Sequence, residues 1–488
     1  MKDLAGRVED TILSQAGDSA KVEETQKRLS LTHNRFDLAF KLYFLPLLES
    51  ASYSDYRRAC YKNHIKAFSF GSFAEPGNLE KNSYEKYEDV FRRLLHDIKR
   101  SGFDGAKSLI PLAEDGSILN GAHRTSIAIY LNKAVSVFQT KLPPVNYDYK
   151  HFKKRGVPTD MLDCVAQTFI EHDKNCFLAF VWPAAQGFDD DIETIFSRIA
   201  YKKNVSLNYN GAHNLLSQVY QDEHWLGAKD QNYPGVRNKL VGCFPNFNDV
   251  RVYLFQADGL SEVLALKDQV RDLFNLEKHA IHITDTPEET MRIGRLVFNE
   301  NSLHFLNNAN PNRFCDSEDK ANAFLEALAS KGLSVNNYVL DSGLVMAIYG
   351  LRKANDIDYL TTSISFETDE IEHHADELPY HGVSEIELVD NPKYYFWYED
   401  LKYISLNQLY IMKNNRSEEK DRLDNALIKS LISNAPFKVT CNKIKFAYYL
   451  RKEWLWLKTK LSLIEILKII GVYDQARMLY RKKYKKGG

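Results

Sequence analysis

The chain is predicted to be a multidomain protein of mixed α/β and α+β class, for three reasons. At 488 residues it exceeds the usual size of a single domain. Its hydrophobic content of 44%, with 12% aromatic residues, is enough for several buried cores. Strand-like and helix-like segments alternate through its middle. We expect a first domain in residues 1–150, an α/β domain in 151–310, a third domain in 311–435 and a basic helical tail in 436–488.

The composition argues against a membrane-spanning, secreted or disulfide-bonded protein. No stretch approaches the roughly 20 apolar residues that a membrane span needs. The first residues lack the apolar segment of a secretory signal. None of the six cysteines forms a C-x-x-C pair, so neither a zinc site nor a disulfide framework is indicated. These cysteines are Cys60, Cys164, Cys176, Cys243, Cys315 and Cys441. We therefore expect a cytoplasmic protein.

The first 150 residues are expected to combine helices with short strands. Residues 1–50 are predicted to be helical, because apolar side chains from Phe36 to Leu48 fit one wide helical face. An Asp115-Gly116 turn is expected to join two short strands. The other expected elements are a helix at 84–98, strands at 108–112, 117–119 and 135–138, and a helix at 125–131.

Residues 120–124, Asn-Gly-Ala-His-Arg, lie at the start of the helix expected at 125–131. Their residue types suit a bound phosphate. Gly121 lets the backbone approach a ligand closely, the helix start offers N–H donors, and Arg124 is a bidentate donor to phosphate. Residues 75–140 resemble the ParB/sulfiredoxin-like family, whose G-x-H/R-R segment holds nucleotide phosphates.

On this resemblance, Gly121, His123 and Arg124 bind a nucleotide. Ala122 stands where the sulfinic-acid reductases of that family have cysteine, so reductase chemistry is not expected. The alternative is a structural turn in which His123 caps a helix and Arg124 lies on the surface.

Residues 151–310 alternate strand-like and helix-like segments, which predicts an α/β layer. Thr286-Pro287-Glu288-Glu289 is a strong helix start. His282 lies at the carboxyl end of the preceding strand, where ligands bind in open α/β sheets. His282 and Asp285 are therefore a candidate acid–base pair. The alternative is a plain strand end whose Asp285 helps to cap the next helix.

Residues 341–358, DSGLVMAIYGLRKANDID, carry the strongest chemical signal in the chain. Asp356 and Asp358 are two residues apart, so on a strand they share a face. Two carboxylates so close repel each other unless a cation such as Mg²⁺ lies between them. The turn at residues 341–343 feeds an apolar helix, and a helix start suits phosphate.

This segment resembles the nucleotidyltransferase superfamily of polymerase-β-like fold, and within it the abortive-infection branch. On the resemblance, Ser342 and Arg352 steady donor phosphates, and Asp356 and Asp358 bind the metal. Asp341 departs from the family, which has glycine there, and an acid beside a triphosphate is unfavourable. The family also places a third carboxylate on the next strand. Residues 382–389 are expected to be that strand, with Glu385 and Glu387 on one face and Glu387 as a metal ligand.

Residues 402–425 support the same resemblance. The family has a lysine and a K-D-x-x-D signature in a helical segment after the sheet, and four residues match it: Lys413, Lys420, Asp421 and Asp424. On the resemblance Lys413 contacts a phosphate, whereas Asp421 supports the fold.

The tail is strongly basic. From residue 438 onward, 14 Lys/Arg stand against 3 Asp/Glu, a net charge of +11, although the whole chain is at −1. A broad apolar face is expected from Trp454, Leu455, Trp456, Leu461, Ile464, Leu467 and Ile470. Such a helix suits an anionic membrane surface. The alternative is a helix packed on the third domain. Nothing is arranged like a nucleic-acid recognition module.

The whole pattern resembles large cytoplasmic proteins of bacterial surface-polysaccharide gene clusters. We therefore expect a Mg²⁺-dependent transferase of nucleotidyl, phosphoryl or phosphosugar type. Its donor would be a nucleotide or phosphorylated sugar, and its acceptor a glycan or small molecule. Two alternatives stay open. One is a glycosyl or phosphosugar transferase with its chemistry in the first or middle domain. The other is a defence-type nucleotidyltransferase or a non-catalytic module.

Overall fold

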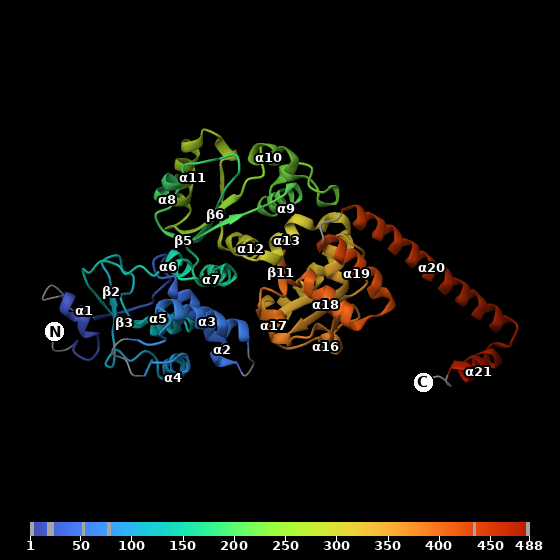
Figure 1. Cartoon of the computed structure of the whole chain (residues 1–488), viewed down its shortest axis with the longest axis horizontal. Helices are drawn as coiled ribbons and strands as arrows, with labels where there is room; N and C mark the ends of the chain where they lie inside the picture. The colour runs from blue at the N-terminus through green and yellow to red at the C-terminus, as the bar shows by residue number, and fades with distance from the viewer. Residues whose placement is uncertain (1–3, 17–23, 51–53, 76–79, 433–435, 485–488) are drawn as a thin grey trace. The chain divides into compact units, whose positions relative to one another are not determined.

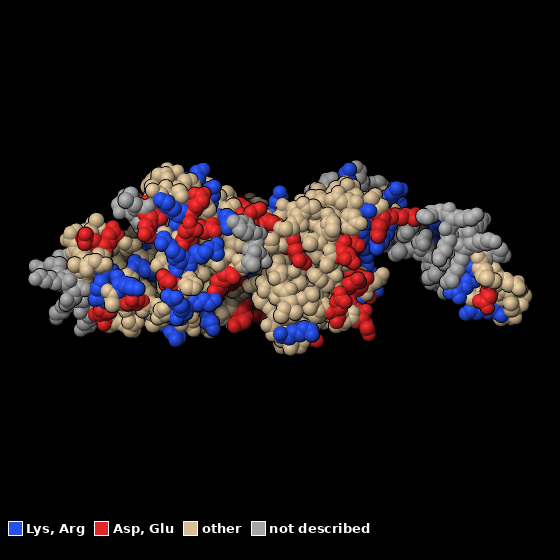
Figure 2. All heavy atoms as spheres, turned by 90° about the horizontal axis from the view of Figure 1, so that it is seen from below, with Lys and Arg blue, Asp and Glu red and all other residues tan. Residues whose placement is uncertain are grey.

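The computed structural model describes residues 4–16, 24–50, 54–75, 80–432 and 436–484, and within the tail it describes only some of the side chains. The chain is of mixed α/β class and divides into two compact units, Met1–Leu409 and Tyr410–Gly488. The described part of the first unit holds three separate sheets (Figure 1). On the face shown in Figure 2, acidic and basic side chains of this unit are interspersed.

The first sheet has the strand order β1-β3-β2, and apolar residues of α1, Ile12 and Leu13, pack against the cluster that contains Phe138 of β3. Strand β1 pairs antiparallel with β3, and β2 pairs parallel with β3. The expected strand at 117–119 contributes only an isolated bridge, Leu112 to Ile118. The elements are α1 (Asp10–Ala16), β1 (Glu24–Lys27), α2 (Asp37–Glu49), α3 (Asp55–Phe68), α4 (Tyr84–Ser101), β2 (Ile110–Leu112), α5 (Ala122–Tyr130) and β3 (Val135–Gln139).

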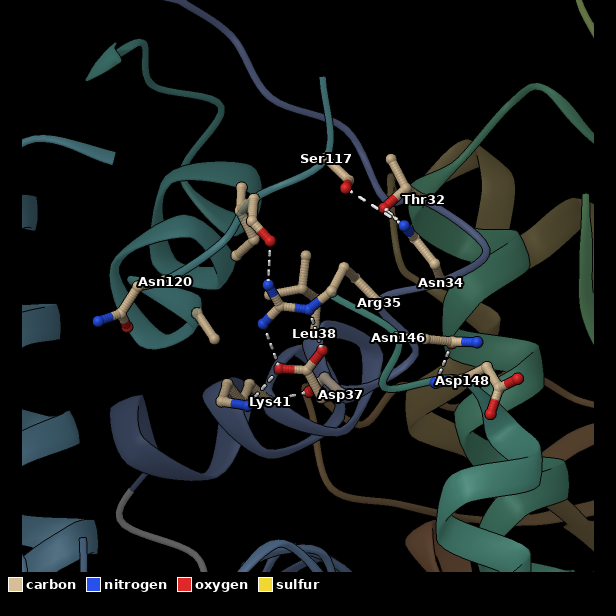
Figure 3. Close-up of polar contacts among 12 residues, drawn as sticks. Thr32, Asn34, Arg35, Asp37, Leu38, Lys41, Ser117, Asn120, Asn146 and Asp148 are labelled. Carbon is tan, nitrogen blue, oxygen red and sulfur yellow. Dashed lines mark hydrogen bonds and ion pairs between the residues drawn. The ribbon is translucent and has the colours of Figure 1, made fainter. Parts of the chain in front are cut away.

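A buried ion network fixes the start of α2 (Figure 3). Arg35 Nε and Nη2 lie 2.8 and 3.0 Å from the two carboxylate oxygens of Asp37, and Lys41 Nζ lies 3.1 Å from Oδ2. Arg35 also donates to the carbonyl of Ile118, which ties α2 to the loop before α5. Burial lowers the pKa of Lys41 to about 8 against the opposing charge of Asp37. The pKa of Asp37 stays well below its usual range, because Arg35 and Lys41 outweigh the effect of burial.

The middle sheet has the order β5-β6-β4-β7, and every pair in it is antiparallel. This is the β-α-β-β-α-β arrangement of a split β-α-β motif, with α9 and α10 inserted between β5 and β6. Helices α8 and α11 pack on one face through Ile192, Val263 and Val270. The elements are α6 (Tyr149–Lys154), α7 (Thr159–His172), β4 (Cys176–Val181), α8 (Asp189–Ile195), β5 (Ile199–Val205), α9 (Tyr209–Val219), α10 (Val236–Cys243), β6 (Val250–Gln256), α11 (Leu260–Phe274), β7 (Ile281–Ile283), α12 (Pro287–Val297) and α13 (Glu300–Asn308).

The third sheet has the order β10-β9-β8-β12-β11, with parallel and antiparallel pairs. The strand expected at 382–389 is wrong: helix α17 occupies Glu385–Asp390. Its adjacent residues Leu388 and Val389 are both buried, which a helix allows and a strand with one buried face does not. The elements are α14 (Cys315–Ser330), β8 (Tyr338–Asp341), α15 (Ser342–Ile348), β9 (Ile357–Thr361), β10 (Ile371–His373), α16 (Leu378–His381), α17, β11 (Tyr395–Tyr398) and β12 (Leu401–Ile404).

Lys402, on β12, is a buried ammonium that hydrogen-bonds to carbonyls. Its Nζ donates to the carbonyls of Asn336 and Val389, each at 2.7 Å, and lies 4.5 Å from the ring centre of Tyr395. Burial, only partly offset by the charge of Asp390, lowers the pKa of Lys402 to about 7.

The second unit is helical. It comprises the end of α18 (Leu406–Arg416), α19 (Glu419–Ile432), α20 (Pro436–Ile469) and α21 (Tyr473–Tyr484). The side chains of Trp454, Leu455 and Leu461, part of the expected apolar face, lie outside the described residues. None of the helices in the described part of the chain combines the length and apolar character that crossing a bilayer requires.

Replacing Asp37 by Asn should destabilise the first unit by about 3–5 kcal/mol, because Arg35 and Lys41 would keep their charges in a buried place without a counter-ion. Denaturant unfolding of the full chain measures this. Arg93→Gln is the control. It breaks an ion pair with Glu80 in which both side chains are more than half exposed, and it should cost at most about 1 kcal/mol. Equal losses in the two variants would contradict the assignment.

Lys402 should make stability rise with pH above neutrality. Its pKa is about 7 in the folded chain, against an ordinary value of 10.5, so between these values the unfolded chain binds more protons. The free energy of unfolding therefore increases as pH goes from about 7 towards 10. Melting temperatures measured across this range should rise less steeply in Lys402→Met than in the wild type. If the melting temperatures of the wild type and of Lys402→Met changed equally with pH, Lys402 would be charged in the folded chain across this range.

Candidate functional site

Three acidic residues form a row across β8, β9 and β10. Asp341 stands directly opposite Asp358 in the antiparallel β8–β9 pair. Asp358 in turn stands opposite Glu372 in the parallel β9–β10 pair. Residues at opposed positions point to the same face of a sheet, so the three carboxylates share one face. Asp356 lies in the bend just before β9, two residues from Asp358, and its charge raises the pKa of Asp358. We call Asp341, Asp356, Asp358 and Glu372 the acidic row.

Asp341 is fully buried, and two imidazoles offset its charge. Its Oδ2 lies 3.3 Å from Nδ1 of His374 and 3.2 Å from Nε2 of His381. Burial opposes ionisation, yet the two histidines hold the pKa of Asp341 well below its usual range. Its other oxygen, Oδ1, is buried and accepts no hydrogen bond from any residue that the structure describes. Such an atom is costly, and it marks a position where a bound cation would be stabilised.

Asp358 is almost fully buried, and Asp356 is exposed. Burial raises the pKa of Asp358 to about 6, and the charges of Asp356, Asp341 and Glu372 add to this shift. His374, whose Nε2 lies 3.8 Å from Asp358 Oδ1, acts in the opposite direction. The proximity of these acids therefore makes the ionised form of Asp358 dependent on a neighbouring positive charge.

His374 bridges two members of the acidic row. Burial alone would lower its pKa, but the hydrogen bond to Asp341 and the charges of Asp341 and Asp358 raise it above the usual value. Ser342 Oγ lies 3.5 Å from the same Nδ1 that faces Asp341. In a Ser-His-Asp triad the serine and the aspartate contact opposite ring nitrogens, so this arrangement is not such a triad.

The start of α15 lies beside the acidic row. Ser342 has φ of 50°, a left-handed conformation that is uncommon outside glycine. A Cβ on the next residue, Gly343, would stand 3.6 Å from Asp356 Oδ1, so Asp356 lies near the first turn of α15. Gly350, at φ of 70°, has a structural reason to be glycine, because a Cβ there would come within 2.6 Å of the Asn310 carbonyl oxygen. Arg352 is half-buried and donates to the carbonyl of Lys353 at 3.0 Å.

The acidic row fits Mg²⁺ by its chemistry. Its members are hard oxygen donors, and one of their oxygens, Oδ1 of Asp341, is buried without a hydrogen bond from the described residues. Among the described residues, no three His, Cys, Asp or Glu side chains already converge as a metal cage. Mg²⁺ commonly binds through one or two carboxylates, with waters and substrate phosphates as its other ligands. Asp356 and Asp358 would hold it in that manner.

The two acids expected as candidates for a third carboxylate lie outside the acidic row. Glu387, predicted as a metal ligand, lies on α17 and accepts from the backbone N–H of Tyr56 at 3.2 Å and from Asn391 at 2.9 Å. Glu385 accepts from the Thr361 backbone N–H at 3.0 Å. Neither belongs to the acidic row, and the acid on the strand next to β9 is Glu372.

Lys413 is buried in an ion cluster of the second unit. Its Nζ lies 3.2 Å from Asp421 and 2.9 Å from Asp424, and Asp421 also pairs with Arg416. Both neighbouring carboxylates already occupy its ammonium, so the structure gives Lys413 a stabilising role in place of the expected phosphate contact. The packing role expected for Asp421 agrees with these contacts.

The expected nucleotide site in the first domain is only partly assembled. Gly121 precedes α5 with φ of 85°, as a close backbone approach allows. His123 Nε2 lies 2.7 Å from the Tyr61 hydroxyl, and its ring packs edge-on against Phe91. Burial lowers the pKa of His123 well below its usual value. Arg124 is half-buried, and burial lowers its pKa too, against the charge of Glu75.

His282 pairs with a different acid from the one expected. Its Nε2 lies 3.1 Å from Glu289 on α12, whereas Asp285 is exposed and pairs with Lys267 at 3.6 Å. The middle sheet is antiparallel, so the rule that places ligands at the carboxyl ends of parallel strands does not apply. Glu289 also accepts from the Asp285 backbone N–H at 2.8 Å, and its own backbone N–H donates to Oγ1 of the N-cap residue Thr286 at 3.1 Å, so the pair is part of the start of α12.

Comparisons with protein-family models, with curated proteins and with solved structures found no match to this chain. The acidic row therefore rests on its own geometry. The sequence analysis did not identify Glu372, His374 or His381 as site residues. It described Asp341 only as a departure from the family's glycine that is unfavourable beside a triphosphate. The segment Ile371-Glu372-His373-His374 was a usable signal, because an acid and a histidine two residues apart share a face on a strand.

Glu289→Gln should destabilise the middle domain by about 1–2 kcal/mol, because it weakens the contact with His282 in a mostly buried place. Asp285→Asn should stay within about 0.5 kcal/mol, since Asp285 is exposed. Urea unfolding of both variants measures the difference. A larger loss of stability in Asp285→Asn than in Glu289→Gln would instead support the pair expected from the sequence, His282 and Asp285.

Proposed function

We propose that this chain is a Mg²⁺-dependent transferase that moves a nucleotidyl or phosphoryl group onto a hydroxyl of a sugar, a sugar-phosphate or a glycan. The observation that carries the proposal is the acidic row, with its opposed Asp341 and Asp358 and the unpartnered Oδ1 of Asp341. The resemblance of residues 311–435 to nucleotidyltransferases supports the same reaction class.

In this proposal Asp356 and Asp358 hold the metal, and Glu372 is the third carboxylate. The bound Mg²⁺ would supply positive charge that stabilises the donor phosphates as the leaving group departs. Ser342 and Arg352 would orient those phosphates. The attacking group would be the acceptor hydroxyl, so the chain needs no covalent nucleophile of its own.

Asp341 is compatible with a phosphate donor because its charge is compensated. A bare aspartate at the start of α15 would repel phosphate oxygens. Here His381 and His374 each contact its Oδ2, so the group presents far less negative charge to a ligand. The departure from the family at this position is thus offset by two histidines supplied from β10's end and from α16.

The other domains fit accessory roles in this proposal. The ParB/sulfiredoxin-like first domain would bind a nucleotide through Gly121 and Arg124. The middle domain, 151–310, would position the acceptor. Assembly of a bacterial surface polysaccharide in the cytoplasm, at the inner face of the membrane, suits a donor and an acceptor of this chemistry.

A second candidate is a non-catalytic binding module, and one observation favours it. His374 lies 3.3 Å from Asp341 and 3.8 Å from Asp358, so its imidazolium compensates both acids without a metal. In that case the third domain would bind a ligand while chemistry took place in the first or middle domain.

Asp358→Asn separates these candidates. With the full chain, Mg²⁺ binding measured by calorimetry should weaken at least about tenfold, because a buried carboxylate ligand is lost. Turnover of nucleoside triphosphates or nucleotide-sugars, followed as pyrophosphate or nucleotide release with sugar-phosphate acceptors, should fall by about 100-fold or more.

Asp369→Asn is the matched control, since Asp369 is exposed and lies outside the acidic row. It should change neither quantity. If Asp358→Asn retains full turnover while Arg124→Ala abolishes it, the chemistry belongs to the first domain.

A further inference from the structure

Helix α20 exposes large apolar side chains along one side. Six of its described apolar residues are between 50% and 85% exposed: Ile444, Tyr448, Trp456, Leu463, Ile466 and Ile469. At 100° per residue, these six fall within about 140° of the helix circumference. With 34 residues, α20 is about 50 Å long. The stripe runs from Ile444 to Ile469, about 38 Å along the helix, and an exposed apolar surface of this length marks an interaction surface.

Basic residues lie on the same stripe. Exposed Lys452 takes the place between Tyr448 and Trp456 in the i, i+4 series, and exposed Lys445 falls within the same arc. The tail from residue 438 onward carries a net charge of +11, from 14 Lys/Arg against 3 Asp/Glu. The surface that covers this stripe must therefore accept apolar groups and be negatively charged.

This combination selects among the candidate occupants. A second copy of the tail would bring two strongly positive surfaces together and bury lysines between them, which is unfavourable. A nucleic acid would match the charge but would leave the isoleucines and leucines without an apolar partner. An anionic lipid bilayer satisfies both requirements, because acyl chains take the apolar groups and headgroup phosphates take the ammonium ions.

We propose that α20 docks the protein on an anionic lipid bilayer, lying in the plane of the interface. The isoleucine, leucine and aromatic side chains of the stripe insert into the boundary between headgroups and acyl chains. Lys445 and Lys452 extend their amines outward to the headgroup phosphates. This proposal does not depend on the transferase assignment.

Flotation of the full chain with vesicles tests the proposal. The protein should bind vesicles of phosphatidylcholine and phosphatidylglycerol at a 7:3 ratio and bind pure phosphatidylcholine at least fivefold less. Binding should weaken at 0.5 M NaCl, because salt screens the lysine contacts. Ile466→Glu/Ile469→Glu should reduce the bound fraction at least fivefold.

Ile364→Glu is the control, because Ile364 is 71% exposed and belongs to the first unit. It should bind like the wild type, and circular dichroism should show that all variants keep their helix content. Absence of binding to anionic vesicles, or binding that the double variant leaves unchanged, would overturn the proposal. So would light scattering without lipid that shows a wild-type dimer and a monomeric double variant, since the stripe would then join two copies.

Discussion

The candidate site depends on the contacts that a buried carboxylate, Asp341, makes with two histidines. A carboxylate enclosed at the end of β8 requires polar partners, and His374 and His381 both contact it, on one oxygen only. The two contacts constrain the positions of the residues after β10, because both imidazoles must reach Oδ2 of Asp341. They also leave the second oxygen without a hydrogen bond from any described residue. The same electrostatic constraint thus organises the loop, orients the histidines and concentrates negative charge where a divalent cation would be stabilised.

Contacts between distant segments hold the third sheet against the first domain within the first unit. Arg57 on α3 pairs with Asp390 at the end of α17 at 2.8 Å, and Glu387 accepts from the start of the same α3. These contacts explain why residues 385–390 form a helix that packs on α3 and not a further strand. Glu387 therefore takes part in packing against α3, and the acid that stands opposite Asp358 on the neighbouring strand is Glu372 of β10. The acidic row and the start of α5 therefore belong to the same compact unit.

The second unit differs from the first in how its charged and apolar side chains are distributed. Its buried ion cluster around Lys413 stabilises the turn between α18 and α19, and beyond that cluster the exposed side of α20 is apolar and basic together. In the first unit, buried cations such as Arg35 and Lys41 share a carboxylate, and exposed charges of both signs are mixed. Membrane docking and the proposed transfer reaction are compatible, although neither requires the other.

The sequence by itself determined the local elements and the residue types of the site. Apolar periodicity located α2, α4 and β3, the Thr286 cap located α12, and the Asp356–Asp358 spacing located the acid pair, because these signals arise within a few residues. Only the tertiary structure decided which distant groups meet. The register of β8, β9 and β10 aligned Asp341, Asp358 and Glu372, the antiparallel middle sheet gave His282 its partner Glu289, and packing on α3 made a helix of residues 385–390. Strand pairing and charge compensation depend on residues far apart in the chain, and no local pattern specifies them.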